Sequence, residues 1–67
     1  MSTIRVNGED QPLAASVAEL VQTLGLKPDA KGVAVAVNGA VVPRGAWAAT
    51  TLAPGDAVEV IRALQGG

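Results

Sequence analysis

Alternating polar and apolar residues predict a β-strand near each end of the chain. Residues 3–6 place two branched aliphatic side chains on one face of such a strand. Residues 57–62 do the same, with Glu59 and Ile61 on the face opposite the valines. Each segment therefore has one side that suits a core and one side that suits an exposed surface.

Two Asn-Gly pairs, at residues 7–8 and 38–39, predict tight hairpin turns because both residue types tolerate a positive φ. The first turn would lead into a short strand at residues 11–14. Pro12 has no backbone N–H, so it suits a strand end or a sheet edge. The second turn would lead into a returning strand at residues 41–42, which Pro43 stops.

The continuous apolar run at residues 33–37, with valine at alternate positions, predicts a buried strand. Residues 44–51 show no strand period, and we expect a turn or a short helical piece there. Pro-Gly-Asp at residues 54–56 predicts a further turn before the last strand.

A short helix is predicted at residues 17–24, where apolar side chains recur at helical spacing. Ser16 and Glu19 form a capping box, the sequence signature of a helix start. Gly25 is placed to end the helix in a left-handed conformation, and Leu26 can cover that end.

This order of elements, β-β-α-β-β-β, predicts an α+β domain with one main helix on one face of a mixed, four- to five-stranded sheet. The first and last strands would lie side by side in the middle, between the two hairpins. That is the β-grasp, or ubiquitin-like, arrangement. We expect one domain over residues 1–67, with residues 63–67 forming a flexible C-terminal tail.

The composition fits a small core and excludes several kinds of chemistry. The 67 residues are 49% hydrophobic and include no cysteine or histidine, which removes disulfides, Cys-based zinc sites and the commonest general base. Trp47 is the only aromatic residue and is expected to pack in the core or at its rim. A net charge of −1 argues against nucleic-acid binding.

No apolar run approaches the roughly 20 residues that cross a membrane, and the N-terminus lacks the pattern of a signal peptide. We therefore expect a cytoplasmic protein.

Several of these features together resemble the ThiS family, the sulfur carrier proteins of thiamin biosynthesis. They are Val-Ala-Val-Asn at residues 35–38, Val-Pro-Arg at 42–44 followed by Trp47, Pro-Gly-Asp at 54–56, and the terminal Gly66 and Gly67. The resemblance covers essentially the whole chain.

The resemblance implies that the chain is not an enzyme but a co-substrate. An ATP-dependent activating enzyme would adenylate the carboxylate of Gly67, sulfur would replace AMP to give a thiocarboxylate, and a thiazole synthase would take up that sulfur. The activating enzyme would supply ATP and Mg²⁺, so no bound cofactor or metal is expected. We expect a monomer when the chain is free.

The residues themselves favour the tail as the reactive part. Glycine has no Cβ, so Gly66 and Gly67 would form a thin thread that can enter a narrow active site. If the chain carries sulfur, the absence of cysteine leaves the Gly67 carboxylate as the one plausible site. The exposed sheet face beside the last strand is expected to dock on partners, with Arg62 and Leu64 as contacts. The acidic pair at residues 9–10 is interpreted as part of a solvated first turn.

Three alternatives remain open at this point. The chain could be a carrier of the kind found as the small subunit of molybdopterin synthase, which also ends in Gly-Gly on a β-grasp fold. It could be a ubiquitin-like modifier that is joined to protein lysines. It could also be a non-catalytic β-grasp interaction module with an incidental tail.

Overall fold

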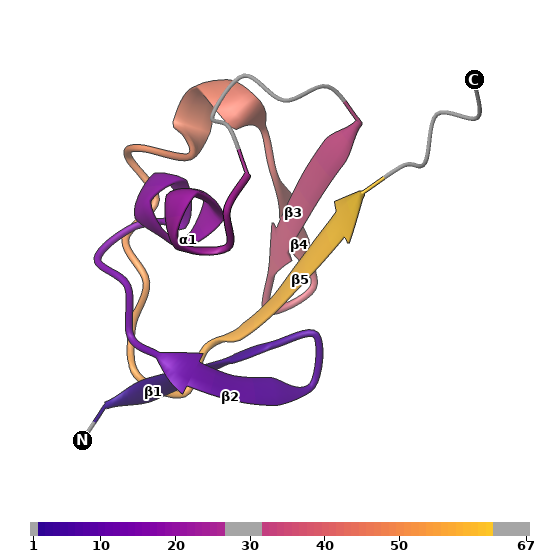
Figure 1. Cartoon of the computed structure of the whole chain (residues 1–67). Helices are drawn as coiled ribbons and strands as arrows, with labels where there is room; N and C mark the ends of the chain where they lie inside the picture. Colours follow the sequence, from indigo (N-terminus) through magenta and orange to yellow (C-terminus); the bar gives the residue numbers. More distant parts are fainter. Residues whose placement is uncertain (1, 27–31, 63–67) are drawn as a thin grey trace.

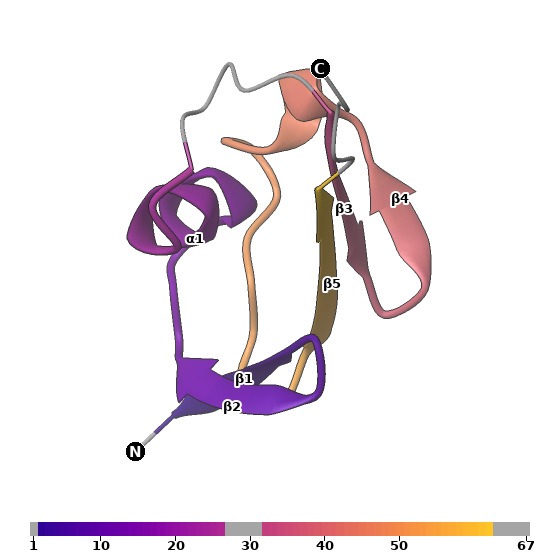
Figure 2. The ribbon, with the colours of Figure 1, turned by 45° about the vertical axis from the view of Figure 1, so that its right-hand side comes forward.

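In the part of the chain that the structure describes, five strands form one mixed sheet, and a helix lies against one of its faces (Figures 1 and 2). The computed structural model describes residues 2–26 and 32–62. The strands are β1 (Thr3–Val6), β2 (Glu9–Pro12), β3 (Val33–Val37), β4 (Ala40–Val42) and β5 (Ala57–Arg62). The helix α1 spans Val17–Thr23, and a 3₁₀ helix, η1, spans Arg44–Ala46.

The strand order is β2-β1-β5-β3-β4, so the first and last strands are neighbours in the middle of the sheet. β1 and β5 run parallel, whereas β1–β2, β3–β4 and β3–β5 are antiparallel. The order of elements, the central pair of strands and the two flanking hairpins are those that the sequence predicts. The α+β β-grasp architecture is therefore confirmed, with five strands rather than four.

The first hairpin is tighter than the sequence predicts. Asn7 and Gly8 both have positive φ angles, 52° and 85°, and Val6 pairs directly with Glu9 across this two-residue loop. Pairing therefore resumes at once, and β2 begins at Glu9 instead of residue 11. The acidic pair at residues 9–10 lies in this exposed edge strand and not in the turn, so that part of the prediction is wrong.

The apolar strand β3 is buried on one face only. Val35 is 1% exposed and belongs to the core, whereas Ala34 is exposed and Ala36 is half-buried. The continuous run of valine and alanine predicted a strand covered on both faces. The described part of the chain instead places small alanine side chains on the face away from α1.

Helix α1 has its first backbone N–H groups satisfied by the loop that follows η1. Val17 donates to the Thr50 carbonyl at 3.1 Å and Ala18 to the Trp47 carbonyl at 3.2 Å. The Glu19 N–H donates to Ser16 Oγ at 3.2 Å, as the predicted capping box requires. Three of the four N-terminal donors that an α-helix leaves without intrahelical partners are thus accounted for.

The other end of α1 is a Schellman motif. Gly25 has a φ of 82° and donates to the Gln22 carbonyl, while Leu26 donates to the Val21 carbonyl. Leu26 then packs partly against the core. The predicted roles of Gly25 and Leu26 are confirmed, and the helix ends one residue earlier than predicted.

The core lies between α1 and the sheet. It also includes Trp47, at the C-terminal end of η1, and Leu52, in the loop that follows. Trp47 is 2% exposed, and its Nε1–H donates to the Val42 carbonyl at 3.0 Å. The predicted packing role of Trp47 is confirmed. The buried residues are Ile4, Val6, Ala14, Val17, Leu20, Val21, Val35, Trp47, Leu52 and Val58. No helix in the ranges 2–26 and 32–62 has the length and apolar character to cross a membrane.

Candidate functional site at the end of strand β5

Strand β5 leads directly into the C-terminal residues that the sequence predicts to be reactive. It lies in the middle of the sheet, paired with β1 on one edge and β3 on the other (Figure 1). The pairing with β3 continues to the last residue of the strand, where Val33 faces Arg62. The pairing with β1 ends earlier, at Val6 and Val58. The end of β5 is therefore paired with β3 on one edge, whereas its other edge has no pairing with β1 beyond Val58.

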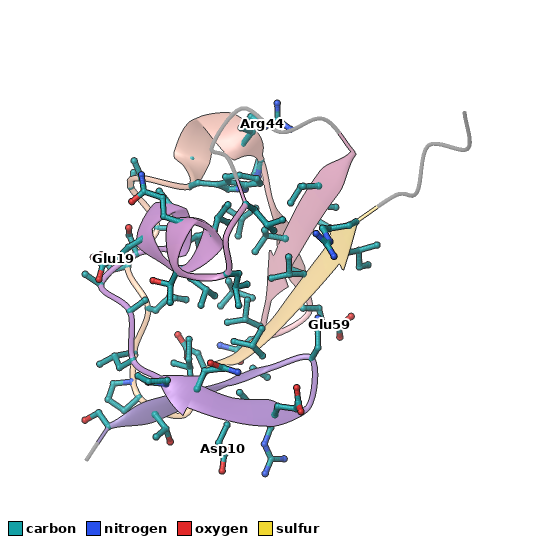
Figure 3. All side chains as sticks on the ribbon, viewed as in Figure 1. Asp10, Glu19, Arg44 and Glu59 are labelled. Carbon is teal, nitrogen blue, oxygen red and sulfur yellow. The ribbon has the colours of Figure 1, made fainter. Side chains whose placement is uncertain are left out.

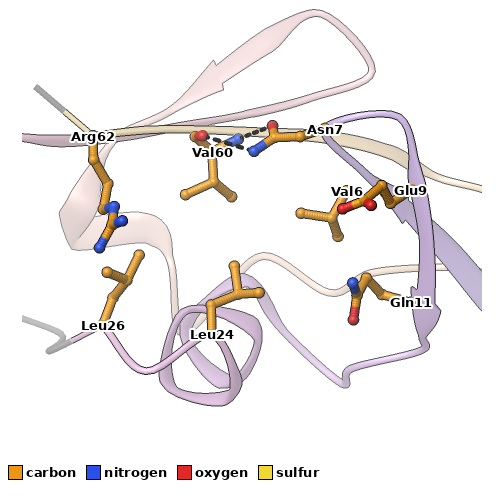
Figure 4. A pocket seen from close by; sticks show the side chains of 8 residues that line it. All are labelled: Val6, Asn7, Glu9, Gln11, Leu24, Leu26, Val60 and Arg62. Atoms are coloured by element: carbon orange, nitrogen blue, oxygen red, sulfur yellow. Dashed lines mark hydrogen bonds between the residues drawn. The ribbon is translucent and has the colours of Figure 1, made fainter.

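The side chains of the two Asn-Gly turns hold β5 at two separate points. Asn7 donates through Nδ2 to the Val60 carbonyl at 3.1 Å and accepts the Val60 N–H on Oδ1 at 2.9 Å (Figure 4). Asn38 accepts the Ala57 N–H on Oδ1 at 3.0 Å. Its backbone N–H also donates to the Ala57 carbonyl at 2.7 Å. The sequence identified both residues only as turn formers.

The start of β5 is further fixed by a carboxylate. Asp56 accepts the Ala53 N–H on Oδ2 at 2.8 Å and the Asn38 Nδ2 on Oδ1 at 3.1 Å. The backbone N–H of Ala53 and, secondly, the Asn38 amide hold the pKa of Asp56 below its ordinary value of 3.8. The ionised form of Asp56 therefore stabilises the turn at residues 53–56.

The face of the sheet away from α1 carries an apolar patch next to the end of β5. Ile61 is 59% exposed and lies opposite Ala34 in the sheet. Val41 is 75% exposed and lies opposite Ala36. We call these four residues the outer patch. Two large aliphatic side chains flank two small ones there, which leaves apolar surface open to a partner.

The face toward α1 carries a groove with a different character. It has a volume of about 470 Å³ and lies between the end of β5, the first hairpin and the end of α1. Figure 4 shows Arg62 reaching toward Leu26, with Leu24 beside it, on this side of the sheet. The groove is lined by Val6, Asn7, Glu9, Gln11, Leu24, Leu26, Val60 and Arg62.

The predicted site residues therefore fall into two groups. Arg62 is exposed at the end of β5, but it lies on the α1 side of the sheet and does not share a face with Ile61. Leu64, Gly66 and Gly67 lie outside the described residues. Because Ile61 precedes Arg62, the alternation of strand side chains puts them on opposite faces.

Sequence reasoning missed Ile61 and Val41 as candidate contacts. The sequence did contain a signal for Ile61. The alternation of residues 57–62 places this apolar side chain on the polar face of the strand, together with Glu59. An apolar residue on a face otherwise expected to meet solvent is informative when it has apolar cross-strand neighbours. That neighbourhood depends on the register of β3 and β4 against β5, which the sequence did not define.

Arg44, which Figure 3 labels away from β5, forms a second feature together with Trp47. The guanidinium carbon of Arg44 lies 5.5 Å from the centre of the Trp47 ring, in cation–π range. With Trp47 buried and hydrogen-bonded to Val42, this pair closes one end of the core. Its geometry is that of a structural contact.

A five-stranded sheet in this order, with one helix on one face and a C-terminal strand at its centre, defines a small ubiquitin-like β-grasp protein. A family model describes the chain more closely: the ThiS family model matches residues 4–67, and the chain belongs to that family. The match extends through the final residue and so includes both terminal glycines.

Two solved structures are similar over nearly the whole chain. One is a crystal structure of the thiamine biosynthesis protein ThiS from Geobacter metallireducens, with 39% identity and a TM-score of 0.75 over 97% of this chain and 99% of that chain. The other is a solution NMR structure of a thiamine biosynthesis protein from the same organism, with 37% identity and a TM-score of 0.76 over 100% and 88%. Comparison with curated proteins gives no match. Membership in the ThiS family supports the role of a sulfur carrier.

Proposed function

We propose that this protein carries sulfur as a thiocarboxylate on Gly67 and donates it for thiazole formation in thiamin biosynthesis. The observation that carries the proposal is the ThiS family match, which spans the fold and reaches the terminal Gly66 and Gly67. The similar structures, named as thiamine biosynthesis proteins, support the same pathway. The absence of cysteine from the sequence supports the carboxylate as the carrying group.

The chemistry needs activation, because an ionised carboxylate is a poor electrophile. In the proposed reaction an oxygen of the Gly67 carboxylate attacks the α-phosphorus of ATP, and pyrophosphate leaves. A sulfur nucleophile then attacks the acyl carbon, and AMP leaves with the electron pair of the broken C–O bond. The activating enzyme supplies ATP and Mg²⁺, and a thiazole synthase accepts the sulfur.

The outer patch is the proposed docking surface for the activating enzyme. Ile61 is exposed and lies one residue before the last residue of β5, so a partner that covers it is close to the start of the tail. Exposed aliphatic side chains that become buried on binding are typical anchors of an interface. Arg62, approached from the α1 side of the sheet, and Leu64, which belongs to the tail, remain candidate contacts.

Intact-mass spectrometry tests the proposal directly. The protein is mixed with its cognate activating enzyme, MgATP and a sulfur source, and the mass should increase by the replacement of one oxygen with sulfur. A variant that lacks Gly66 and Gly67 is the control and should show no change. If neither adenylate nor thiocarboxylate forms under conditions in which a known ThiS protein reacts, the proposal is wrong.

The same samples separate the alternatives. Stable conjugates to lysine side chains would indicate a ubiquitin-like modifier. Sulfur transfer to a molybdopterin precursor, without transfer to a thiazole synthase, would indicate the other class of carrier. Full biological activity of the variant without the two glycines would indicate an interaction module.

A further inference from the structure

The side chain of Asn7 takes the place of a strand where the backbone of β1 turns away. The Arg5 N–H donates to the Asp56 carbonyl and the Asn7 N–H to the Val58 carbonyl, both at 2.9 Å. In a parallel ladder that continued, the Asn7 carbonyl would accept the Val60 N–H, and residue 9 would donate to the Val60 carbonyl. The positive φ of Asn7 instead sends the chain into the hairpin.

The carboxamide of Asn7 makes both of the missing bonds. Its Oδ1 accepts the Val60 N–H at 2.9 Å, and its Nδ2 donates to the Val60 carbonyl at 3.1 Å. A side-chain amide has the same donor and acceptor as a peptide group, so it can extend a ladder by one step. Figure 4 shows these two bonds at the rim of the groove.

The ladder on this edge stops directly after Val60. Backbone groups of alternate residues face the same neighbouring strand, so those of Arg62 face the β1 side. No described residue of β1 pairs with β5 beyond Val58, and the Asn7 bonds end at Val60. Asn7 thus makes the last described contact on this edge of β5.

We infer that Asn7 is a positioning residue, whose carboxamide fixes the end of β5 and thereby the point and direction from which the reactive tail leaves. The inference rests on the proposed function, since it concerns delivery of the Gly67 carboxylate to the activating enzyme. Without the Asn7 bonds, the Val60 N–H and carbonyl lose their described partners, and the end of β5 is held only through the neighbouring residues that pair with β3. A start point with more freedom presents the carboxylate in the reactive geometry less often, and alignment of reacting groups strongly affects rates.

Asn38 provides a matched control within the same strand. It occupies the same position of an Asn-Gly turn, with a φ of 50° against 52° for Asn7, and its Oδ1 also accepts a backbone N–H of β5. Its partner is Ala57, at the opposite end of β5 from the tail. Glycine tolerates positive φ, so Asn7→Gly and Asn38→Gly remove the carboxamides without adding backbone strain.

Amide hydrogen exchange, followed by NMR at a temperature where all variants are folded, tests whether the contact fixes the end of the strand. In Asn7→Gly the Val60 amide should exchange at least about tenfold faster, measured relative to the Leu20 amide of α1 in the same sample. In Asn38→Gly the Val60 amide should keep its relative protection, and the Ala57 amide should lose it. Unchanged relative exchange at Val60 in Asn7→Gly would overturn the inference.

Steady-state adenylation with the activating enzyme tests the positioning role. The outer patch is intact in both variants, so the KM for the carrier should stay within about twofold, while kcat falls about tenfold for Asn7→Gly. Asn38→Gly should keep the wild-type kcat. An equal fall in kcat for both variants would mean a general effect of stability and would refute the role. If the wild-type protein forms no adenylate, the proposed function itself fails, and the exchange data still show whether Asn7 holds β5.

Discussion

Asp56 shows how one carboxylate can make the stability of this domain depend on pH. Its pKa is held below 3.8 by the Ala53 N–H and then by the Asn38 amide, both of which favour the charged form. A group whose pKa is lower in the folded state stabilises that state above the unfolded pKa. The contribution is therefore complete above about pH 5 and is lost as the pH falls through the folded-state pKa.

The variant Asp56→Asn isolates this contribution. Asparagine has one oxygen and one amide nitrogen, so it can accept only one of the two hydrogen bonds without placing two donors face to face. We expect Asp56→Asn to lower the free energy of unfolding near neutral pH. The difference from the wild type should shrink in acid, where Asp56 is protonated. Urea denaturation over a pH series measures it, and a difference that stays constant into acid would contradict the assignment.

Trp47 carries a large share of the stability because it is the largest buried side chain in a very small core. Trp47→Ala should cost about 3–5 kcal/mol, which is much of the total for a domain of this size. Trp47→Phe keeps most of the ring but leaves the Val42 carbonyl without its donor, and should cost about 1–3 kcal/mol. Far-UV circular dichroism is the measurement, because no other aromatic residue reports unfolding by fluorescence.

Arg44→Ala serves as the control for that series. The Arg44 side chain is exposed and lies over the Trp47 ring, so its removal should cost about 1 kcal/mol or less. A cost for Arg44→Ala equal to that of Trp47→Ala would mean that the ring is held mainly by the cation rather than by burial.

At the scale of elements, two glycines with equal space around them make a direct test of the helix end. An added Cβ would meet no atom within 4 Å at either Gly25 or Gly45, but only Gly25 has a positive φ, of 82°. Gly25→Ala should therefore lower the free energy of unfolding by about 1–2 kcal/mol through backbone strain alone. Gly45→Ala, in η1, should change it by less than about 0.5 kcal/mol. Equal effects in thermal melts would show that the Schellman motif does not limit stability.

The elements also show where sequence reasoning succeeds and where it stops. The helix could be located from Ser16 and Gly25 because local hydrogen bonds at each end decide its limits. The strand β2 was misplaced because its residues are polar, and its pairing is set by the two-residue turn at Asn7 rather than by apolar alternation. The exposed face of β3 was missed because Val-Ala alternation does not reveal which face is covered.

For the candidate site, too, the sequence predicts local features and misses those that depend on strand pairing. The sequence identifies Gly66 and Gly67 because the last residues of the chain need no neighbours to be recognised. It does not identify the bonds of Asn7 to Val60, which join residues 53 positions apart in the chain. It also does not identify the outer patch, whose residues come from three paired strands. Contacts of that kind depend on the register of the central strands, which only the folded chain defines.

Across the whole molecule, the proposed docking surface lies on the face of the sheet away from the core, so a charge placed within it should affect binding but not folding. Ile61 and Thr3 are both exposed β-branched residues, at opposite ends of the central strand pair. Their side chains both point away from the core, because the buried positions Ile4 and Val58 alternate with them. Ile61→Asp and Thr3→Asp therefore add the same charge to one face at different distances from the tail.

We expect Ile61→Asp to weaken binding to the activating enzyme at least about tenfold, because a carboxylate would be desolvated at the centre of the apolar contact. Thr3→Asp should bind within about twofold of the wild type if the contact is confined to the end of β5 near the tail. Isothermal titration calorimetry measures both affinities, and urea denaturation checks that both variants remain folded. Normal binding by a folded Ile61→Asp would exclude the outer patch as the docking surface, and the groove that contains Arg62 would then be the surface to test next.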